Sequence, residues 1–153
     1  PPKSHDRIEW FVEKAVEIGV QEISFILTDH SERKNIKLNR INKRAVSSMK
    51  QSLKAFLPVI NDMLPFKDFM IKCSNDEKYI GYINKGENCH LMRSATTKSD
   101  YCMLIGPEGD FSSSEINESQ KFGFQLVSLG NNRLRTETAG VAACHILNLV
   151  NEK

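Results

Sequence analysis

The 153-residue sequence lacks any run of about 20 consecutive apolar residues, the length that a membrane-spanning helix needs. It does not open with the basic, apolar and small-residue segments of a secretion signal. Its four cysteines form no C-x-x-C pair and fit no zinc-ligand spacing, so we expect buried, reduced thiols and no metal site. It also has neither the G-x-G-x-x-G dinucleotide pattern nor a phosphate loop that ends in Gly-Lys-Ser or Gly-Lys-Thr. These absences disfavour membrane proteins, zinc proteins and enzymes that cradle a nucleotide phosphate.

Positive charge is concentrated in one short part of the chain. The formal net charge is only +2, and 40% hydrophobic and 26% charged residues are the balance of an ordinary globular domain. Residues 33–54, however, contain eight basic residues and no acidic one. Such a block favours a polyanionic partner. The eight are Arg33, Lys34, Lys37, Arg40, Lys43, Arg44, Lys50 and Lys54.

Predicted strands alternate with predicted helices along the chain. Apolar periodicity indicates helices over residues 4–18, 37–56, 66–71 and 138–150, with Gly19 ending the first, and a capping box at Ser112 and Glu115 begins another. Short apolar runs indicate strands over residues 22–27, 79–83, 101–105 and 125–129 and one that starts at Val59, with a turn over 84–87. The alternation predicts an α/β fold with a mostly parallel sheet covered by helices on both faces.

Two of these helices carry further predictions. On a helical wheel, segment 37–56 separates a basic side, expected in solvent, from an apolar side, expected in the core. Segment 139–144 of the last helix consists of small residues that allow close approach, so we expect its burial by its own domain or by a second subunit. The apolar side of the first of these helices comprises Leu38, Ile41, Ala45, Met49, Leu53 and Phe56.

Two segments that each join a strand to a helix are candidates for a binding site. Residues 104–111 contain Gly106 and Gly109, which let the backbone turn sharply and approach a ligand at the strand end. Residues 128–140 bring Arg133, Arg135 and Glu137 to a place where a short neutral turn is expected. Taken singly, the first also fits an ordinary turn and the second a solvated charged loop.

Together the two segments resemble the motifs of the 16S rRNA (uracil-N3)-methyltransferase family, in the SPOUT superfamily. Residues 105–112 are similar to the family's Ile-Gly-Pro-Glu-Gly-Gly-Phe-Ser, and residues 129–139 to its Leu-Gly-x-x-Ile-Leu-Arg-x-Glu-Thr-Ala. The first helix, Gln51-Ser52 and Pro58 also match, so the resemblance covers nearly the whole chain. The sequence departs from the pattern at Asp110, where glycine is usual, and at Arg133, where an aliphatic residue is usual. If position 110 has a positive φ, aspartate tolerates it better than most residues do.

The resemblance implies a SPOUT-type α/β domain over residues 1–153, with a C-terminal trefoil knot that binds S-adenosyl-L-methionine in a homodimer. It implies a cytoplasmic enzyme that methylates a uridine of 16S rRNA in the small ribosomal subunit. The family's N-terminal RNA-binding β-barrel domain is absent from this chain, which we therefore expect to hold RNA weakly. The expected cofactor-binding residues are Thr28, Ile105, Gly106, Glu108, Gly109, Ser128, Leu129, Gly130, Asn132, Leu134 and Thr138.

Methylation at uridine N3 requires removal of a proton and stabilisation of the resulting charge. We assign these roles to Glu137 as base and Arg135 as cation, because both flank the expected cofactor loop. The alternative is a structural ion pair that caps the last helix. Polar residues of segment 37–56 form the expected RNA surface, with an ordinary solvated face as the alternative. These RNA-binding candidates are Arg40, Lys43, Arg44, Lys50 and Gln51.

Three other functions remain open at this point. One is a non-catalytic RNA-binding module, against which the intact Arg135-Thr136-Glu137-Thr138 argues. Another is a nucleotide-phosphate-binding enzyme, for which the glycine segment lacks the usual lysine. The third is a related SPOUT methyltransferase that acts on transfer RNA, which the match along the first helix disfavours.

Overall fold

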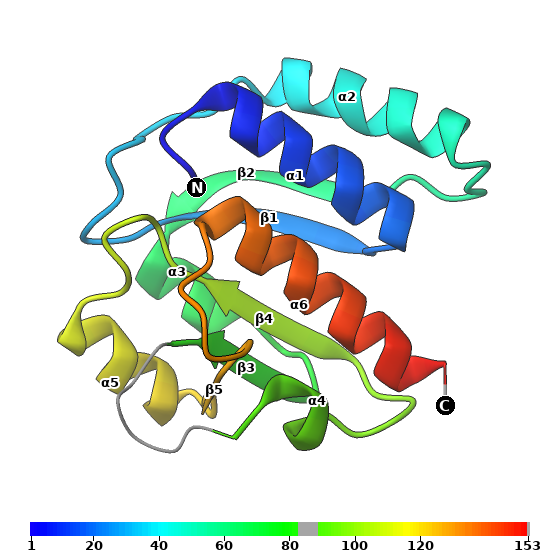
Figure 1. The fold of residues 1–153 in the computed structure, drawn as a ribbon. Coiled ribbons are helices and arrows are strands. Elements are labelled where there is room, and N and C mark those ends of the chain that lie inside the picture. Colours follow the sequence, from blue (N-terminus) through cyan, green and yellow to red (C-terminus); the bar gives the residue numbers. More distant parts are fainter. Residues whose placement is uncertain (83–88, 153) are drawn as a thin grey trace.

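The computed structural model describes residues 1–82 and 89–152, which form an α/β domain (Figure 1). Within these residues, no helix combines the length and the hydropathy that crossing a bilayer requires. The elements, in chain order, are α1 (His5–Ile18), β1 (Glu22–Leu27), α2 (Leu38–Gln51), β2 (Val59–Pro65), α3 (Phe66–Lys72), β3 (Glu77–Gly81), α4 (Leu91–Ser94), β4 (Tyr101–Ile105), α5 (Ser113–Lys121), β5 (Gln125–Val127) and α6 (Thr136–Asn151).

The strand pairs of the described residues are all parallel, as the sequence predicts. β1 pairs with β2, and β3 lies between β4 and β5. The register places Gly81 opposite both Ile105 and Val127, so the carboxyl ends of β3, β4 and β5 meet at one edge. Ligands of open parallel sheets bind at this kind of edge.

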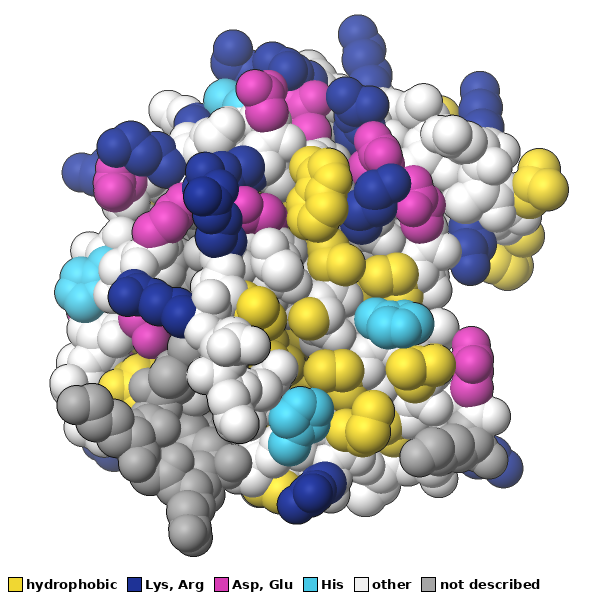
Figure 2. Space-filling view, viewed as in Figure 1, with side chains coloured by type: hydrophobic (Ala, Val, Ile, Leu, Met, Phe, Trp, Pro, Cys, Tyr) yellow, Lys and Arg dark blue, Asp and Glu magenta, His cyan; other side chains and the backbone are white. Residues whose placement is uncertain are grey.

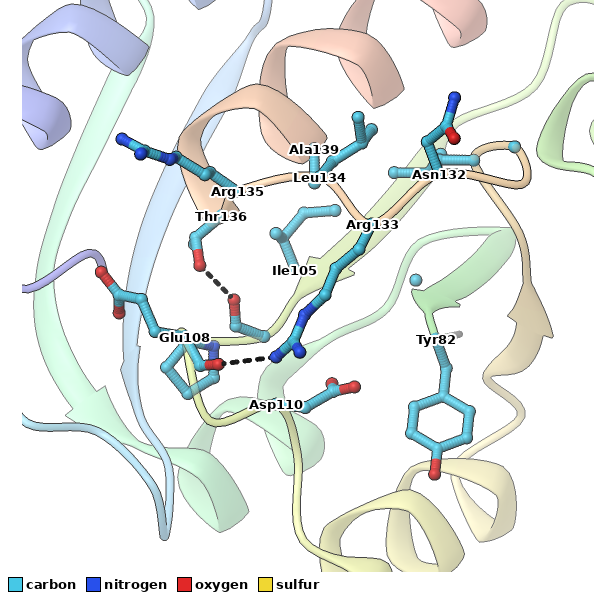
Figure 3. Close-up of a pocket in the computed structure, with 15 residues that line it drawn as sticks. Tyr82, Ile105, Glu108, Asp110, Asn132, Arg133, Leu134, Arg135, Thr136 and Ala139 are labelled. Atoms are coloured by element: carbon cyan, nitrogen blue, oxygen red, sulfur yellow. Dashed lines mark hydrogen bonds between the residues drawn. The ribbon is translucent and has the colours of Figure 1, made fainter. Parts of the chain in front are cut away.

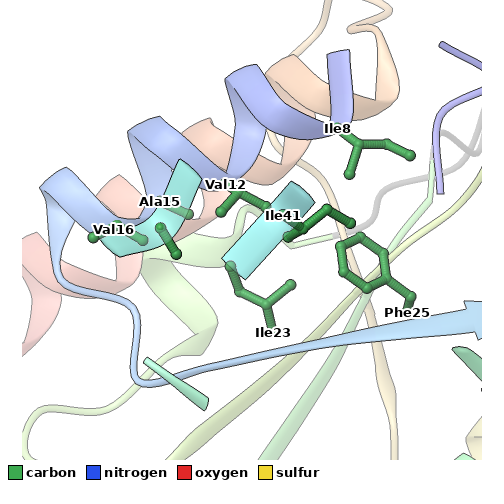
Figure 4. Packing of buried hydrophobic residues seen from close by; sticks show 8 residues of the cluster. Ile8, Val12, Ala15, Val16, Ile23, Phe25 and Ile41 are labelled. Atoms are coloured by element: carbon green, nitrogen blue, oxygen red, sulfur yellow. The ribbon is translucent and has the colours of Figure 1, made fainter. Parts of the chain in front are cut away.

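Alternation along the strands divides the core between two faces. Tyr79 of β3 packs in a cluster with residues of α4 and α6, whereas the next residue, Ile80, packs with residues of α3 and α5. A third cluster joins α1, α2 and β1 (Figure 4). The helices therefore cover both faces, as predicted. The third cluster comprises Ile8, Val12, Ala15, Val16, Ile23, Phe25, Ile41 and Ala45.

Helix α6 packs closely on α1 because its residues are small. Gly140 and Ala143 are buried. A Cβ atom added at Gly140 would lie only 2.6 Å from Cε2 of Phe11. The predicted burial is confirmed for Gly140 and Ala143, whereas the other four residues of segment 139–144 are partly exposed.

Local signals fix two helix ends as predicted. Gly19 ends α1 in the left-handed region, with φ 110°, which glycine adopts at little cost. At the start of α5, the Ser112 hydroxyl accepts a hydrogen bond from the Glu115 N–H at 3.3 Å. The Glu115 carboxylate in turn accepts one from the Ser112 N–H at 2.9 Å, which completes the capping box.

The predicted helix over residues 37–56 is wrong at its C-terminal end. Helix α2 stops at Gln51, where the Ser52 hydroxyl donates to the Ser48 carbonyl at 2.7 Å and Leu53 adopts a φ of 55°. The turn directs the chain away from the helix axis. As a result Leu53 and Phe56 are 92% and 86% exposed instead of lying in the core.

Other differences are smaller. Helix α6 begins two residues before its predicted start, and β5 ends two residues before its predicted end. The short helix α4 was not predicted, because four residues are too few to show a periodicity. Residue Ile83 and the predicted turn over 84–87 lie outside the described residues. All four cysteines are free thiols, as expected, but they are not buried: Cys89 is exposed, and the other three are partly exposed.

Candidate functional site

A cavity of about 360 Å³ lies at the carboxyl ends of β3 and β4 (Figure 3). Two loops form most of it: the glycine loop, residues 106–111, and the arginine loop, residues 128–135. The lining residues are Gly81, Tyr82, Ile105, Gly106, Pro107, Glu108, Asp110, Leu129, Gly130, Asn132, Arg133, Leu134, Arg135, Thr136 and Ala139.

The glycine loop is compact because its first glycine has no room for a side chain. A Cβ atom at Gly106 would lie 2.9 Å from Oδ1 of Asp110 and 3.2 Å from the Phe111 ring. The Asp110 N–H donates to the Pro107 carbonyl at 2.9 Å and closes a turn. Asp110 has a φ of 60°, so the positive φ considered for this position is present.

Two hydrogen bonds join the glycine loop to the arginine loop and to the start of α6 that follows it. The Thr136 hydroxyl, at the start of α6, donates to the Gly106 carbonyl at 3.0 Å. The Arg133 guanidinium reaches across the cavity and donates to the Glu108 carbonyl at 3.5 Å (Figure 3). The two segments that the sequence offers as candidates for a binding site therefore line the same cavity.

Seven of the eleven expected cofactor-binding residues line the cavity: Ile105, Gly106, Glu108, Leu129, Gly130, Asn132 and Leu134. The other four lie outside the lining. Thr28 is buried, with its hydroxyl 2.7 Å from that of Ser31. Gly109 packs against the His30 side chain, Ser128 forms a β-bridge with His90, and Thr138 is exposed on α6. Ligand contacts by these four stay predictions.

The loop after β1 supports the glycine loop from outside the cavity. The His30 Nδ1 lies 3.0 Å from the carbonyl oxygens of both Gly109 and Asp110, so this nitrogen carries the proton and donates it. The buried Glu115 carboxylate accepts from the Asp29 N–H at 2.9 Å. The Asp29 carboxylate in turn accepts from the Ser112 hydroxyl at 2.6 Å. These contacts fix the position of the glycine loop relative to β1.

The predicted base and cation are not paired with each other. Glu137 is only 7% exposed, and its Oε1 lies 3.6 Å from the Arg7 Nε, on α1. Its Oε2 is buried without a hydrogen-bond partner in the described part of the chain. Arg135 is exposed and lines the cavity. The alternative of a structural pair therefore applies to Glu137 with Arg7, not with Arg135.

Acidic residues of α1 neutralise part of the basic surface of α2. The Glu9 carboxylate contacts Arg40 and lies 3.5 Å from Arg44, which is also 3.3 Å from Glu13. Arg40 lies a further 3.4 Å from Asp6. The remaining RNA-binding candidates, Lys43, Lys50 and Gln51, are exposed.

Comparison with known families agrees with this arrangement. A family model described as RNA methyltransferase domain matches residues 1–148. This chain belongs to that RNA methyltransferase family.

Relatives and solved structures of the RNA methyltransferase family match over most of the chain. "Ribosomal RNA small subunit methyltransferase E" of Mesomycoplasma hyopneumoniae is 32% identical, over 87% of this chain and 60% of that protein. A probable rRNA-methyltransferase of Porphyromonas gingivalis is 42% identical with a TM-score of 0.93, over 99% of this chain and 65% of that one. A ribosomal RNA small subunit methyltransferase E of Neisseria gonorrhoeae, bound to S-adenosyl methionine, is 27% identical with a TM-score of 0.89, over 99% and 63%. The chain thus spans about 60% of the length of its curated relatives.

Several residues of the RNA methyltransferase site were not among the predicted site residues. Tyr82 and Pro107 line the cavity, and His30 holds the glycine loop. The sequence feature that could have identified them is their position, near the end of a predicted strand or inside the glycine motif. The partner of Arg7 could not be predicted from sequence, because Glu137 is 130 residues away.

Proposed function

We propose that this RNA methyltransferase domain transfers a methyl group from S-adenosyl-L-methionine to N3 of a uridine in 16S rRNA. The observation that carries the proposal is the cavity that the glycine and arginine loops form together. The names of the relatives support a substrate in the small ribosomal subunit, and the Neisseria structure supports the cofactor. Such a substrate places the activity in the cytoplasm, where ribosomes assemble.

The residues of the cavity fit this cofactor. A volume of about 360 Å³ falls within the usual range of small-molecule sites, roughly 300–1,000 Å³. Leu129, Leu134 and Ile105 offer apolar surface to a planar adenine ring, and the loops offer backbone N–H and C=O groups to its edge. Arg133 or Arg135 can pair with the carboxylate of the methionine part. When bound there, the cofactor supplies an electrophilic methyl group.

Glu137 is the proposed general base for the N3 proton. It is buried, and its unpartnered Oε2 can accept a proton without breaking an existing hydrogen bond. Arg7 holds the other oxygen, which orients the carboxylate. Arg135, exposed beside the cavity, can stabilise the negative charge that develops on the uracil ring.

Replacing Glu137 by glutamine tests this role, because the amide keeps the size of the side chain but cannot act as a base. We expect kcat to fall by about 100-fold or more, with the Kd for cofactor within about twofold of wild type. Glu118→Gln on α5, away from the cavity, is the matched control and should leave both unchanged. Turnover within a few-fold of wild type, with intact cofactor binding, would show that Glu137 is not the base.

RNA contacts are proposed on the exposed polar residues of α2. Lys43, Lys50 and Gln51 are exposed and can meet phosphates or bases, whereas Arg40 and Arg44 must share their charge with acids of α1. Contacts of lysine with phosphates supply affinity that decreases with salt and carries no sequence information.

A homodimer and a trefoil knot are also part of the proposal. Figure 2 shows hydrophobic side chains gathered along the exposed side of α6, and Trp10, Met92 and Leu149 are 37–45% exposed. An apolar surface of this kind supports a contact with a second copy. Analytical ultracentrifugation at micromolar concentration should give a dimer, and a monomer at that concentration would contradict the proposed homodimer.

An experimental density map that follows the backbone from β3 to α6 would test the proposed knot.

The activity itself is tested with small ribosomal subunits that lack N3-methyluridine. The chain and radiolabelled S-adenosyl-L-methionine should transfer label to 16S rRNA, and digestion should recover it as N3-methyluridine. Transfer RNA and 23S rRNA serve as competing substrates. Label in transfer RNA alone, or cofactor binding without transfer to any RNA, would contradict the proposal.

A further inference from the structure

Four charged side chains line the cavity, and their signs balance: Glu108, Asp110, Arg133 and Arg135. Two of them, Asp110 and Arg133, are the positions where this sequence departs from the family motifs. In Figure 3 both point into the same cavity, one from each loop. The departures therefore alter the charge inside the proposed cofactor site.

The Glu108 carboxylate is directed away from the cavity interior. Its Oε1 accepts a hydrogen bond from the Lys3 backbone N–H at 3.1 Å and lies 4.0 Å from the Arg7 guanidinium. Figure 3 shows this side chain pointing outward from the glycine loop. Its negative charge is thus balanced by groups at the N-terminal end of the chain.

The Asp110 carboxylate is held inside the cavity by the backbone N–H of the next residue. Its Oδ1 accepts a hydrogen bond from the Phe111 N–H at 2.8 Å and lies over Gly106, at 2.9 Å from where a Cβ would stand. Its Oδ2 has no hydrogen-bond partner among residues 1–82 and 89–152. Of the two carboxylates in the lining, Asp110 is therefore the one that can bind a cationic group there.

We infer that Asp110 is the counter-charge for the sulfonium group of the methyl donor and makes the cavity discriminate the donor from its neutral product. The inference rests on the proposed function. In the transfer, the N3 lone pair bonds to the methyl carbon, the electrons of the C–S bond stay on sulfur, and the N3 proton goes to the base. Sulfur thereby loses its positive charge, so the carboxylate attracts the donor more than the product.

Arg133 completes this arrangement from the opposite loop. Without ligand, its guanidinium crosses the cavity to the Glu108 carbonyl and places a positive charge next to the glycine loop. No ion pair joins Arg133 to Asp110 within the described residues, so the Asp110 carboxylate stays available to a sulfonium. The product has no charge on sulfur, so its affinity depends little on Asp110.

The test is calorimetry with S-adenosyl-L-methionine and S-adenosyl-L-homocysteine on wild type and Asp110→Asn. Asparagine has the same shape, tolerates φ of 60° and still accepts from the Phe111 N–H, but carries no charge. We expect the Kd for the donor to rise about five- to tenfold and that for the product to change less than about twofold. Sinefungin, with an ammonium in place of the sulfonium, should follow the donor. Glu118→Gln on α5, away from the cavity, is the matched control and should leave both Kd values unchanged.

The outcomes distinguish failure of the inference on Asp110 from failure of the proposed function. If Asp110→Asn weakens both ligands equally, Asp110 shapes the loop or binds the amino group that both ligands share, and the inference is wrong. Unchanged binding of all ligands would also overturn it. If wild type binds neither ligand, the proposed function fails, which is a separate result. Asp110→Gly, which also permits the backbone conformation, should reproduce the loss of discrimination if the asparagine variant folds poorly.

Discussion

Replacing Gly140 by alanine tests the close contact between α1 and α6. The added Cβ would lie 2.6 Å from Cε2 and 2.9 Å from Cδ2 of Phe11, well inside the usual carbon–carbon contact of about 3.5–4.0 Å. Helix propensity alone predicts the opposite effect, because alanine inside a helix is favoured over glycine by about 1 kcal/mol. The sign of the change therefore shows which effect is larger.

Packing should outweigh propensity at this position. Inserting a methyl group into a well-packed contact costs about 1–3 kcal/mol, since side chains must leave their preferred rotamers. Subtracting the propensity gain leaves a net loss of about 1 kcal/mol in the free energy of unfolding. For a chain of this length, that loss lowers Tm by about 2–4 °C.

Thermal unfolding followed by circular dichroism measures this effect, and a second variant identifies its cause. Phe11→Leu removes the ring that the new methyl group meets. In that background Gly140→Ala should be neutral or stabilising by up to about 1 kcal/mol. A single Gly140→Ala variant that is more stable than wild type would refute the close contact.

Three further predictions concern the site and the surface. Thr136→Val removes the hydroxyl that joins α6 to the glycine loop, so the Kd for cofactor measured by calorimetry should rise about fivefold, whereas Thr136→Ser should bind like wild type. Lys43→Glu combined with Lys50→Glu should weaken rRNA binding about tenfold or more in a filter assay at low salt, and unchanged affinity would remove α2 as the RNA surface. A hydrogen bond from Cys102 lowers the pKa of the Cys73 thiol to about 7. Alkylation of Cys73 by iodoacetamide should therefore level off above about pH 8, as mass spectrometry can follow, whereas a thiol of ordinary pKa would keep gaining reactivity beyond it.

The sequence was sufficient for features that depend on neighbouring residues. The apolar run of β4 and the capping box at Ser112 are local, and both agree with the structure. The end of α2 was not predictable in this way, because apolar residues continue at helical spacing through Leu53 and Phe56. The helix ends because the backbone at Leu53 is left-handed. A leucine side chain gives no reason to predict this conformation.

The site, too, was predictable only where it depends on residues that are close in sequence. The two loops were predictable because each lies in one continuous motif, and their meeting at a strand edge follows from the parallel sheet. The partners of the charged residues were not predictable, since Arg7 meets Glu137 and Arg44 meets Glu9 only through the packing of α1 against α6 and α2. The assignment of Arg40 and Arg44 to an RNA surface took no account of this neutralisation.

The contrast between two buried glutamates bears on the choice of base. Each oxygen of Glu9 faces an arginine, Arg40 or Arg44, so its negative charge is matched on both sides. Glu137 is buried to a similar degree, but only one of its oxygens faces a cation, and the other has no partner in the described residues. The Glu9 Oε1 also makes no hydrogen bond within the described residues, so the two glutamates differ in the charges that their oxygens face and not in their hydrogen bonds. The oxygen of Glu137 that faces no cation is therefore better explained as the place where the substrate brings its proton, and this distinguishes Glu137 from Glu9 as a base.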